Sequence, residues 1–224
     1  MPTYGKIYQH MANTRKGLKT QDTILQTAKH LFYLYGFDKV SLNDICIQSS
    51  KKLGTLTYYF PKKWDIVDAL YQQYMSKIRQ FVTENCADLS PAQQYVNTVV
   101  AYYYNIYKDS AITRFHHHIM LASSMNDIFA DTKQLVLPLV VEDIDDDLLD
   151  LYIQADNAVR RELNLAFMRD TKRRSLSNIV DLVRRIHLVS TRLYGFDPET
   201  LKVYIADAQR FVESHPNSIH LIEI

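Results

Sequence analysis

The chain contains few of the residues that interrupt helices. Its 224 residues include only five glycines and six prolines, roughly half of average usage. Sandwiches and barrels need many tight turns, which these two residues favour. An all-β fold is therefore disfavoured.

The chain is also poor in cysteines and in uninterrupted apolar runs. Cys46 and Cys86 are too few for a disulfide framework. The longest uncharged run, residues 90–107, carries five glutamine, asparagine and threonine residues that a bilayer would reject. The first 20 residues are polar and lack an apolar export segment. These features predict a cytoplasmic protein without a membrane partner.

The charge is distributed unevenly along the chain. The net charge is only +1, but residues 1–64 hold ten lysines and arginines against three aspartates, a net charge of +7. The remaining residues have a net charge of −6. A basic N-terminal part on an acidic body is typical of nucleic-acid contact. The alternative is a solvated charge imbalance without any partner.

Apolar residues recur with the spacing of helices along the whole chain, which predicts an all-α protein with about nine helices and no strand. Gly36 follows the first such segment as a C-terminal cap would, and Ser41, Ser90 and Asp197 are placed as N-terminal caps. The helical segments are 21–35, a short one from 41, 53–60, 62/63–82, 91–108, 111–123, about 126–140, about 145–172, 175–194 and 198–214.

Two short helices between longer ones in a basic region suggest a helix-turn-helix. The residues that carry a closer match are Ala28, Leu31-Phe32, Gly36-Phe37, Ser41-Leu42, Asp44-Ile45, Gly54-Thr55-Leu56, Tyr59-Phe60 and Lys63. With them, residues 24–70 resemble the DNA-binding domain of TetR-type transcriptional regulators. The resemblance implies a DNA-binding domain at 20–64, after a basic flexible arm at 1–19. A helical regulatory and dimerisation domain would follow at 65–224.

The resemblance also implies which residues contact double-stranded DNA. The third helix would enter the major groove, Gly54 would let the backbone approach, and Lys63 would clamp a phosphate. The turn before that helix, Ser50-Lys51-Lys52, departs from the family's usual pattern. Either Ser49 or Ser50 caps the third helix, or the turn is looser. The predicted DNA-binding residues are Ser41, Lys51, Lys52, Gly54, Thr55, Thr57, Tyr58, Tyr59 and Lys63.

The segment 95–107 is apolar nearly all round, which predicts a central buried helix. Its tyrosines need hydrogen-bond partners when they are buried, and a ligand could provide them. We therefore predict a small, mostly apolar or aromatic effector; packing as plain core is the alternative. The predicted ligand-binding residues are Tyr103, Tyr107, Phe115, Met120 and Phe129.

The last two predicted helices carry apolar faces that are too long to be buried in one body of this size, which predicts a homodimer with a four-helix interface. The steps of three and four residues in the first face are typical of helices that pack lengthwise. The predicted interface residues are Leu176, Ile179, Val183, Ile186, Leu193, Leu201, Tyr204, Ala208 and Phe211.

Other polar clusters do not indicate a catalytic or metal site. His116, His117 and His118 are consecutive, and consecutive helical residues point about 100° apart, so they cannot close on one ion. The acidic run in 142–150 lacks the glycine and spacing of a calcium loop. No glycine-rich phosphate loop or nucleophile elbow is present. We expect no cofactor, no metal and no enzyme activity.

The function most consistent with these features is a one-component transcriptional regulator, expected to be a repressor. It would bind a near-palindromic operator as a dimer, and a small molecule in the helical body would control its affinity. The first alternative is a TetR-like co-activator or adaptor that acts through protein contacts without reading DNA. The second alternative is an enzyme or a metal-storage bundle.

Overall fold

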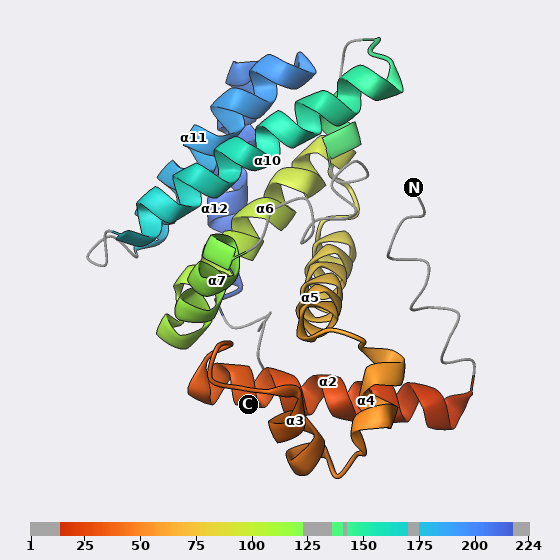
Figure 1. Ribbon diagram of the computed structural model, residues 1–224. Coiled ribbons are helices and arrows are strands. Elements are labelled where there is room, and N and C mark those ends of the chain that lie inside the picture. Colours follow the sequence, from red (N-terminus) through yellow and green to blue (C-terminus); the bar gives the residue numbers. More distant parts are fainter. Residues whose placement is uncertain (1–13, 123–135, 141–142, 170–174, 217–224) are drawn as a thin grey trace. The chain divides into compact units, whose positions relative to one another are not determined.

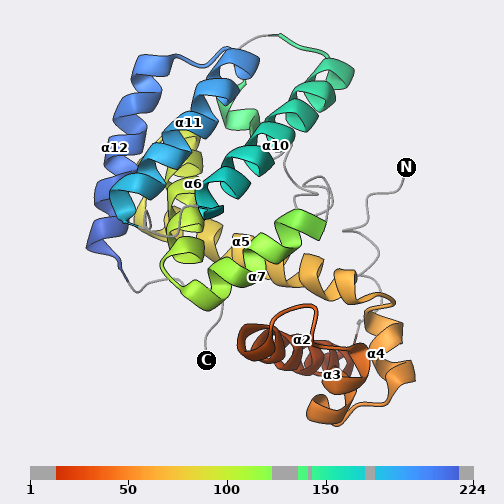
Figure 2. The ribbon, with the colours of Figure 1, turned by 60° about the vertical axis from the view of Figure 1, so that its left-hand side comes forward.

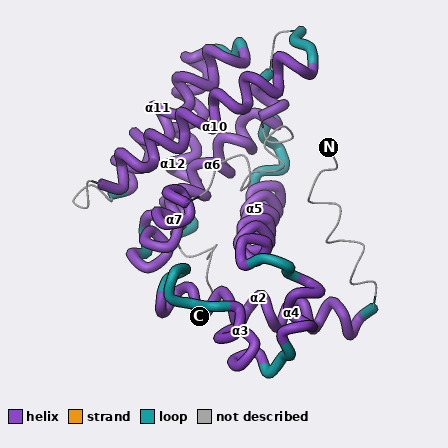
Figure 3. The backbone as a smooth tube through the Cα atoms, in the orientation of Figure 1, coloured by secondary structure: helices purple, strands orange, loops and turns teal. Residues whose placement is uncertain are grey.

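The computed structural model describes residues 14–122, 136–140, 143–169 and 175–216. Within these ranges the chain forms nine α-helices and one 3-10 turn, without any strand, which confirms the predicted all-α class (Figures 1 and 3). The elements are α2 (Arg15–Tyr35), α3 (Leu42–Ser49), α4 (Leu53–Tyr59), α5 (Lys63–Asn85), α6 (Pro91–Tyr107), α7 (Ser110–Ala122), η1 (Leu137–Leu139), α10 (Asp146–Arg169), α11 (Leu176–Tyr194) and α12 (Pro198–Ser214).

The chain divides into two compact units between Gln73 and Tyr74, inside α5. The first unit contains α2, α3, α4 and the beginning of α5. The second contains the end of α5 and all the later helices. Each unit has its own core and is described by itself.

The first unit is built on α2, which contacts both α3 and α4. Five large apolar side chains form the centre of its core, and each is fully buried: Ile24, Phe32, Ile45, Leu56 and Phe60. Such residues hold the two short helices in place, because a helix of seven or eight residues is marginal without tertiary packing.

Helix α2 begins earlier than the sequence predicted. Its first residue is Arg15, and the Thr14 hydroxyl caps it by accepting a hydrogen bond from the Gly17 amide at 3.0 Å. Residues 15–19 are therefore helical, so the predicted flexible arm at 1–19 is wrong over its last five residues. Residues 1–13 lie outside the described ranges.

The helix ends follow the predicted caps. Gly36 ends α2 with φ of 85°, a backbone conformation that favours glycine. The hydroxyl of Ser41 caps α3, that of Ser90 caps α6, and the Asp197 carboxylate caps α12. Local signals therefore define where these helices begin and end.

The second unit surrounds α6, which contacts α7, η1, α11 and α12 (Figure 2). Helix α10 packs against α7 and α11, and α12 also contacts α11. Nearly every residue of α6 is buried, which confirms the predicted central helix. The hydroxyl of Tyr74 donates to the Tyr102 carbonyl at 3.1 Å and fastens the end of α5 to α6.

The apolar faces of α11 and α12 lie inside this core. Five of the nine side chains that we predicted at a dimer interface are buried within one chain: Ile179, Val183, Ile186, Leu201 and Ala208. These five are unavailable to a second chain, so the prediction is corrected for them. The reason is that α11 and α12 use this face to cover α6 and each other. Leu176, Leu193, Tyr204 and Phe211 are half-buried.

No helix in the described part of the chain is long and apolar enough to cross a membrane.

Candidate functional site

Helices α3 and α4 are joined by a short turn with a left-handed residue. Ser50 has φ of 54°, and the next amide, from Lys51, donates to the Cys46 carbonyl at 3.0 Å. The hydroxyl of Ser49 turns back to the Ile45 carbonyl at 2.6 Å, and Lys52 occupies the N-cap of α4 without a side-chain hydrogen bond. Neither serine caps α4.

Helix α4 has one face in the core and one face in solvent. Leu56 and the following Phe60 are completely buried. Leu53 and Tyr58 are each about half exposed, at 51%. The remaining members of the predicted contact set near this helix are exposed or half-buried: Lys51, Lys52, Gly54, Thr55, Thr57 and Tyr59.

Two side chains on this face have contacts within the helix. The Thr57 hydroxyl donates to the Leu53 carbonyl at 3.0 Å. The rings of Tyr58 and Tyr59 meet edge to face, with their centroids 5.0 Å apart. The face therefore presents hydroxyl oxygens and aromatic rings in a partly ordered arrangement.

The fold does not require a glycine at position 54. A Cβ atom built on Gly54 would have no heavy atom within 4 Å, and the backbone has no left-handed φ. A glycine inside a helix costs about 1 kcal/mol relative to alanine. Nothing within the described chain offsets that cost.

Lys63, the first residue of α5, is directed into its own unit. Its ammonium donates to the Phe37 carbonyl at 2.8 Å and to the Val40 carbonyl at 2.9 Å, and it lies 3.9 Å from the centre of the Phe37 ring. Partial burial lowers the pKa of Lys63. Two of its three N–H groups thus hold the α2–α3 connection, and the predicted phosphate contact of Lys63 stays a prediction.

Ser41 is similarly engaged. Its hydroxyl donates to the Asp44 carboxylate at 2.6 Å and accepts from the Asp44 amide at 3.1 Å, while its own amide also donates to that carboxylate. These hydrogen bonds lower the pKa of Asp44. Ser41 is exposed, but its structural role is to start α3.

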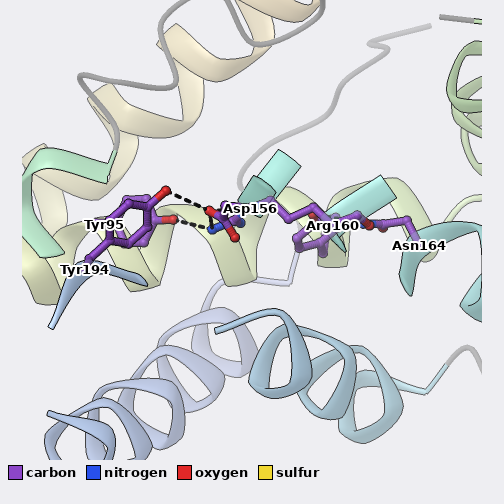
Figure 4. A network of polar contacts seen from close by, with 6 residues as sticks. Tyr95, Asp156, Arg160, Asn164 and Tyr194 are labelled. Atoms are coloured by element: carbon purple, nitrogen blue, oxygen red, sulfur yellow. Dashed lines mark hydrogen bonds and ion pairs between the residues drawn. The ribbon is translucent and has the colours of Figure 1, made fainter. Parts of the chain in front are cut away.

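The second unit holds a polar cluster in its core, drawn in Figure 4. Arg160 on α10 donates from Nε to the Asp156 carboxylate at 2.9 Å and from Nη2 to the Tyr95 hydroxyl at 2.9 Å. The Tyr194 hydroxyl at the end of α11 donates to the same carboxylate at 3.3 Å. All four side chains are buried. An ion pair and two phenols from α6, α10 and α11 are therefore held away from water.

Asn164, one turn further along α10, engages two of the predicted ligand-binding residues. Its amide nitrogen donates to the Tyr103 hydroxyl at 3.1 Å and to the Arg160 carbonyl at 2.7 Å. The Tyr107 hydroxyl donates to the Asn164 amide oxygen. Both phenols point inward, and both have partners from the same chain, so neither needs a ligand for a hydrogen bond.

His187 on α11 stands out in this cluster. It is fully buried, and its ring lies nearly parallel to that of Tyr95, with the centroids 5.6 Å apart. Among the described residues neither of its ring nitrogens has a hydrogen-bond partner. Burial, and then the positive charge of Arg160, lowers the pKa of His187 well below its usual range. The imidazole is therefore neutral at physiological pH, with one donor and one acceptor.

The other predicted ligand-binding positions have different surroundings. Phe115 and Met120 on α7 are buried, and Phe129 lies outside the described residues. His116 is buried beside Tyr102 and Tyr107, and burial lowers its pKa to about 3. Within the described ranges no three metal-ligating side chains gather in one place.

Sequence reasoning missed the polar side chains of this cluster on α10 and α11. Asp156, Arg160 and Asn164 recur every four residues, so they share one face of α10. A polar stripe at this spacing within a helix that also buries Leu149 and Leu165 was the available signal. His187 offered none, since its burial depends on what lies opposite α11.

Comparisons with known proteins agree with the fold. Residues 24–70 match the family model of bacterial regulatory proteins, tetR family. The structure resembles RolR in complex with resorcinol, with a TM-score of 0.56, 15% identity, and coverage of 88% of this chain and 94% of that chain. Ligand-free RolR gives a TM-score of 0.52 at 14% identity, covering 90% of this chain and 100% of that chain.

A third solved structure, described as the molecular basis for control of antibiotic production by bacterial hormones, has a TM-score of 0.50 and 14% identity. The match covers 77% of this chain and 97% of that one. Identities this low establish a shared fold. The matched segment, residues 24–70, confirms the resemblance that the motif residues predicted for the helix-turn-helix region.

Proposed function

We propose that this protein is a transcriptional regulator, a repressor that acts in the cytoplasm on double-stranded DNA. The observation that carries the proposal is the two-sided α4: its inner face is anchored by Leu56 and Phe60, and its outer face is polar and open. A helix of this kind fits the major groove of B-DNA.

The residues of this face divide into two roles. Lys51 and Lys52 contact backbone phosphates, which set affinity and orientation. Thr55, Thr57, Tyr58 and Tyr59 contact base edges, and Gly54 allows close approach. Lys63 acts as a positioning residue, since its ammonium holds the connection at Phe37 and Val40.

The experiment is a titration of operator-containing genomic fragments at several salt concentrations. Each phosphate contact steepens the log–log dependence of affinity on salt by about 0.9. Lys52→Ala should flatten the slope by about twice that in a dimer, whereas Lys202→Ala on α12 serves as the matched control without effect. Salt-independent binding, or binding to no fragment, would contradict the proposal.

The regulator is proposed to bind a near-palindromic operator as a homodimer. The solvent-facing sides of α11 and α12 contain Leu188 and Val203, which are 52% and 58% exposed. Four half-buried residues on these helices would extend the proposed interface: Leu176, Leu193, Tyr204 and Phe211.

A pair of charge substitutions tests the dimer. Leu188→Asp should yield folded monomers, because a carboxylate would be buried without a partner in the interface. Leu121→Asp on α7 changes a residue of similar exposure, 55%, and should leave the dimer intact. Sedimentation of the wild-type chain as a monomer at micromolar concentration would refute this arrangement.

A small-molecule effector in the second unit is proposed to control DNA affinity by changing the separation of the two DNA-binding units. The support is the polar core around α6, and the fact that RolR, a protein of similar fold, has been solved with resorcinol. The test measures operator affinity with and without an added ligand. As the control, substitution of the DNA-contacting residues should leave ligand binding unchanged.

One observation favours a second candidate, an adaptor that binds a protein. Ile47 on α3 and Leu53 on α4 are exposed aliphatic residues, at 66% and 51%. In a DNA reader they would meet thymine methyl groups; in an adaptor they would meet an apolar partner surface. If Ile47→Ser weakens binding only at thymine-containing DNA sites, the result supports the DNA-binding regulator. If Ile47→Ser weakens binding at no DNA site, the result supports the adaptor.

A further inference from the structure

Burying three residues of the polar cluster in a helical core carries a large desolvation cost. Asp156 and Arg160 form a buried ion pair, and Tyr95 completes it. Desolvating such a pair cancels most of its Coulomb attraction, and apolar residues of similar size are often equally stabilising. Stability alone therefore gives no reason for this group of residues.

His187 adds an unsatisfied group beside that pair. Buried polar atoms in native proteins are nearly always hydrogen-bonded, and an exception calls for a specific explanation. Here both ring nitrogens lack partners within the described part of the chain, and the side chain is completely enclosed. A molecule that supplies one donor and one acceptor would satisfy both nitrogens.

The charges around His187 define what that molecule is. Arg160 is neutralised by Asp156, and the imidazole itself is neutral, so the cluster holds no excess charge for an ionic ligand. The ring of Tyr95, nearly parallel to that of His187, makes the surroundings aromatic. Rings of this kind pack favourably against another aromatic ring.

We infer that His187, beside Tyr95 and Arg160, binds an uncharged, single-ring aromatic alcohol, whose hydroxyl group exchanges hydrogen bonds with the imidazole. This inference rests on the proposed small-molecule control and gives it a site and a ligand class. It places the ligand's polar group at the α6–α10–α11 contact, on α11 rather than at Tyr103 and Tyr107, whose hydroxyls are bonded to Asn164.

The experiment measures thermal unfolding of the full chain without DNA. The probes are benzyl alcohol and phenol, with benzoate and benzylamine as charged analogues of the same size, all at millimolar concentration. The neutral probes should raise the melting temperature by several degrees, and the charged ones should not. Stabilisation by benzoate or benzylamine equal to that by benzyl alcohol would overturn the inference, as would no response to either neutral probe.

Two variants locate the binding site. His187→Phe should abolish the response to benzyl alcohol and raise the melting temperature of the free protein, because it removes two unpaired polar atoms. His116→Phe, at another fully buried neutral histidine, should keep the response. A response retained by His187→Phe, or lost only in His116→Phe, would overturn the assignment.

A third outcome distinguishes a buried water from a ligand. If a water alone satisfies His187, the His187→Phe variant melts lower and still responds to the probes as the wild type does, which contradicts the inference. These measurements contain no DNA. A negative result would therefore overturn this inference without affecting the proposed DNA binding, which the salt titration tests separately.

Discussion

The two units of the chain bury different kinds of side chain. The core of the first unit is apolar, and among its described residues only Lys29 and Ser49 are buried polar groups. The second unit buries several, including Asp156, Arg160 and His187. The first unit thus keeps most of its polar side chains at its surface, whereas the second unit encloses several of them in its core.

The largest expected loss of stability comes from breaking the buried ion pair of the second unit. Arg160→Met leaves Asp156 uncompensated and should lower the free energy of unfolding by about 3–5 kcal/mol. The double variant Asp156→Leu with Arg160→Met should recover at least half of this loss, because no lone charge remains. Urea denaturation measures both. A single-variant loss below about 1 kcal/mol would show that water reaches the pair.

Acid should destabilise the second unit through its buried histidines. The pKa of His116 in the folded chain is about 3, and that of His187 is also well below 6.5. Below pH 6.5 the unfolded chain therefore binds protons that the folded chain excludes, so this stability is fully present above pH 6.5 and is lost as the pH falls. Each histidine contributes a slope of about 1.4 kcal/mol per pH unit.

The measurement is the free energy of unfolding at pH 6.5 and pH 5. His116→Phe should retain about 2 kcal/mol of the stability that the wild type loses between these values. His30→Phe, at an exposed position on α2, is the control and should keep the wild-type slope. Identical slopes for the wild type and His116→Phe would mean that this histidine is accessible to protons in the native state.

In the first unit, Lys63 should contribute more to folding stability than to the salt dependence of DNA binding. Lys63→Met removes two hydrogen bonds from a charged donor and should cost about 1–2 kcal/mol. Lys62→Met, at the exposed neighbour, should cost less than about 0.5 kcal/mol. In DNA titrations Lys63→Met should leave the salt slope unchanged; a slope flattened by about 0.9 per site would assign Lys63 to a phosphate instead.

The smallest expected change in stability is at Gly54. Gly54→Ala should leave the fold unchanged or stabilise it by up to about 1 kcal/mol, while it weakens DNA binding through the added methyl group. Gly36→Ala is the matched control, because its φ of 85° strains any other residue and should destabilise the unit. Unchanged operator affinity in Gly54→Ala would remove this residue from the proposed interface.

Features that depend on neighbours along the chain were predictable. The caps at Ser41, Ser90 and Asp197 and the glycine after α2 follow from hydrogen bonds or backbone angles within a few residues. The same holds for α4, whose buried residue Leu56 and the buried Phe60 that follows the helix are four positions apart. The helix-turn-helix could be recognised because its short elements follow one another directly.

The apolar faces of α11 and α12 show where such reasoning stops. Steps of three and four residues identified Ile179, Val183 and Ile186 as one face, and that face is indeed buried. The pattern could not say whether the covering surface belongs to the same chain or to a second copy, because both remove the same apolar area from water.

The sequence by itself determined the class of the fold, several helix caps and the family resemblance of residues 24–70, since each depends on residues close together in the chain. Only the tertiary structure decided which polar groups meet. Arg160 reaches the Tyr95 hydroxyl across 65 positions, and Lys63 reaches the Phe37 carbonyl across 26. Such contacts depend on how whole helices pack, and packing is set by the summed burial of many side chains rather than by any local pattern.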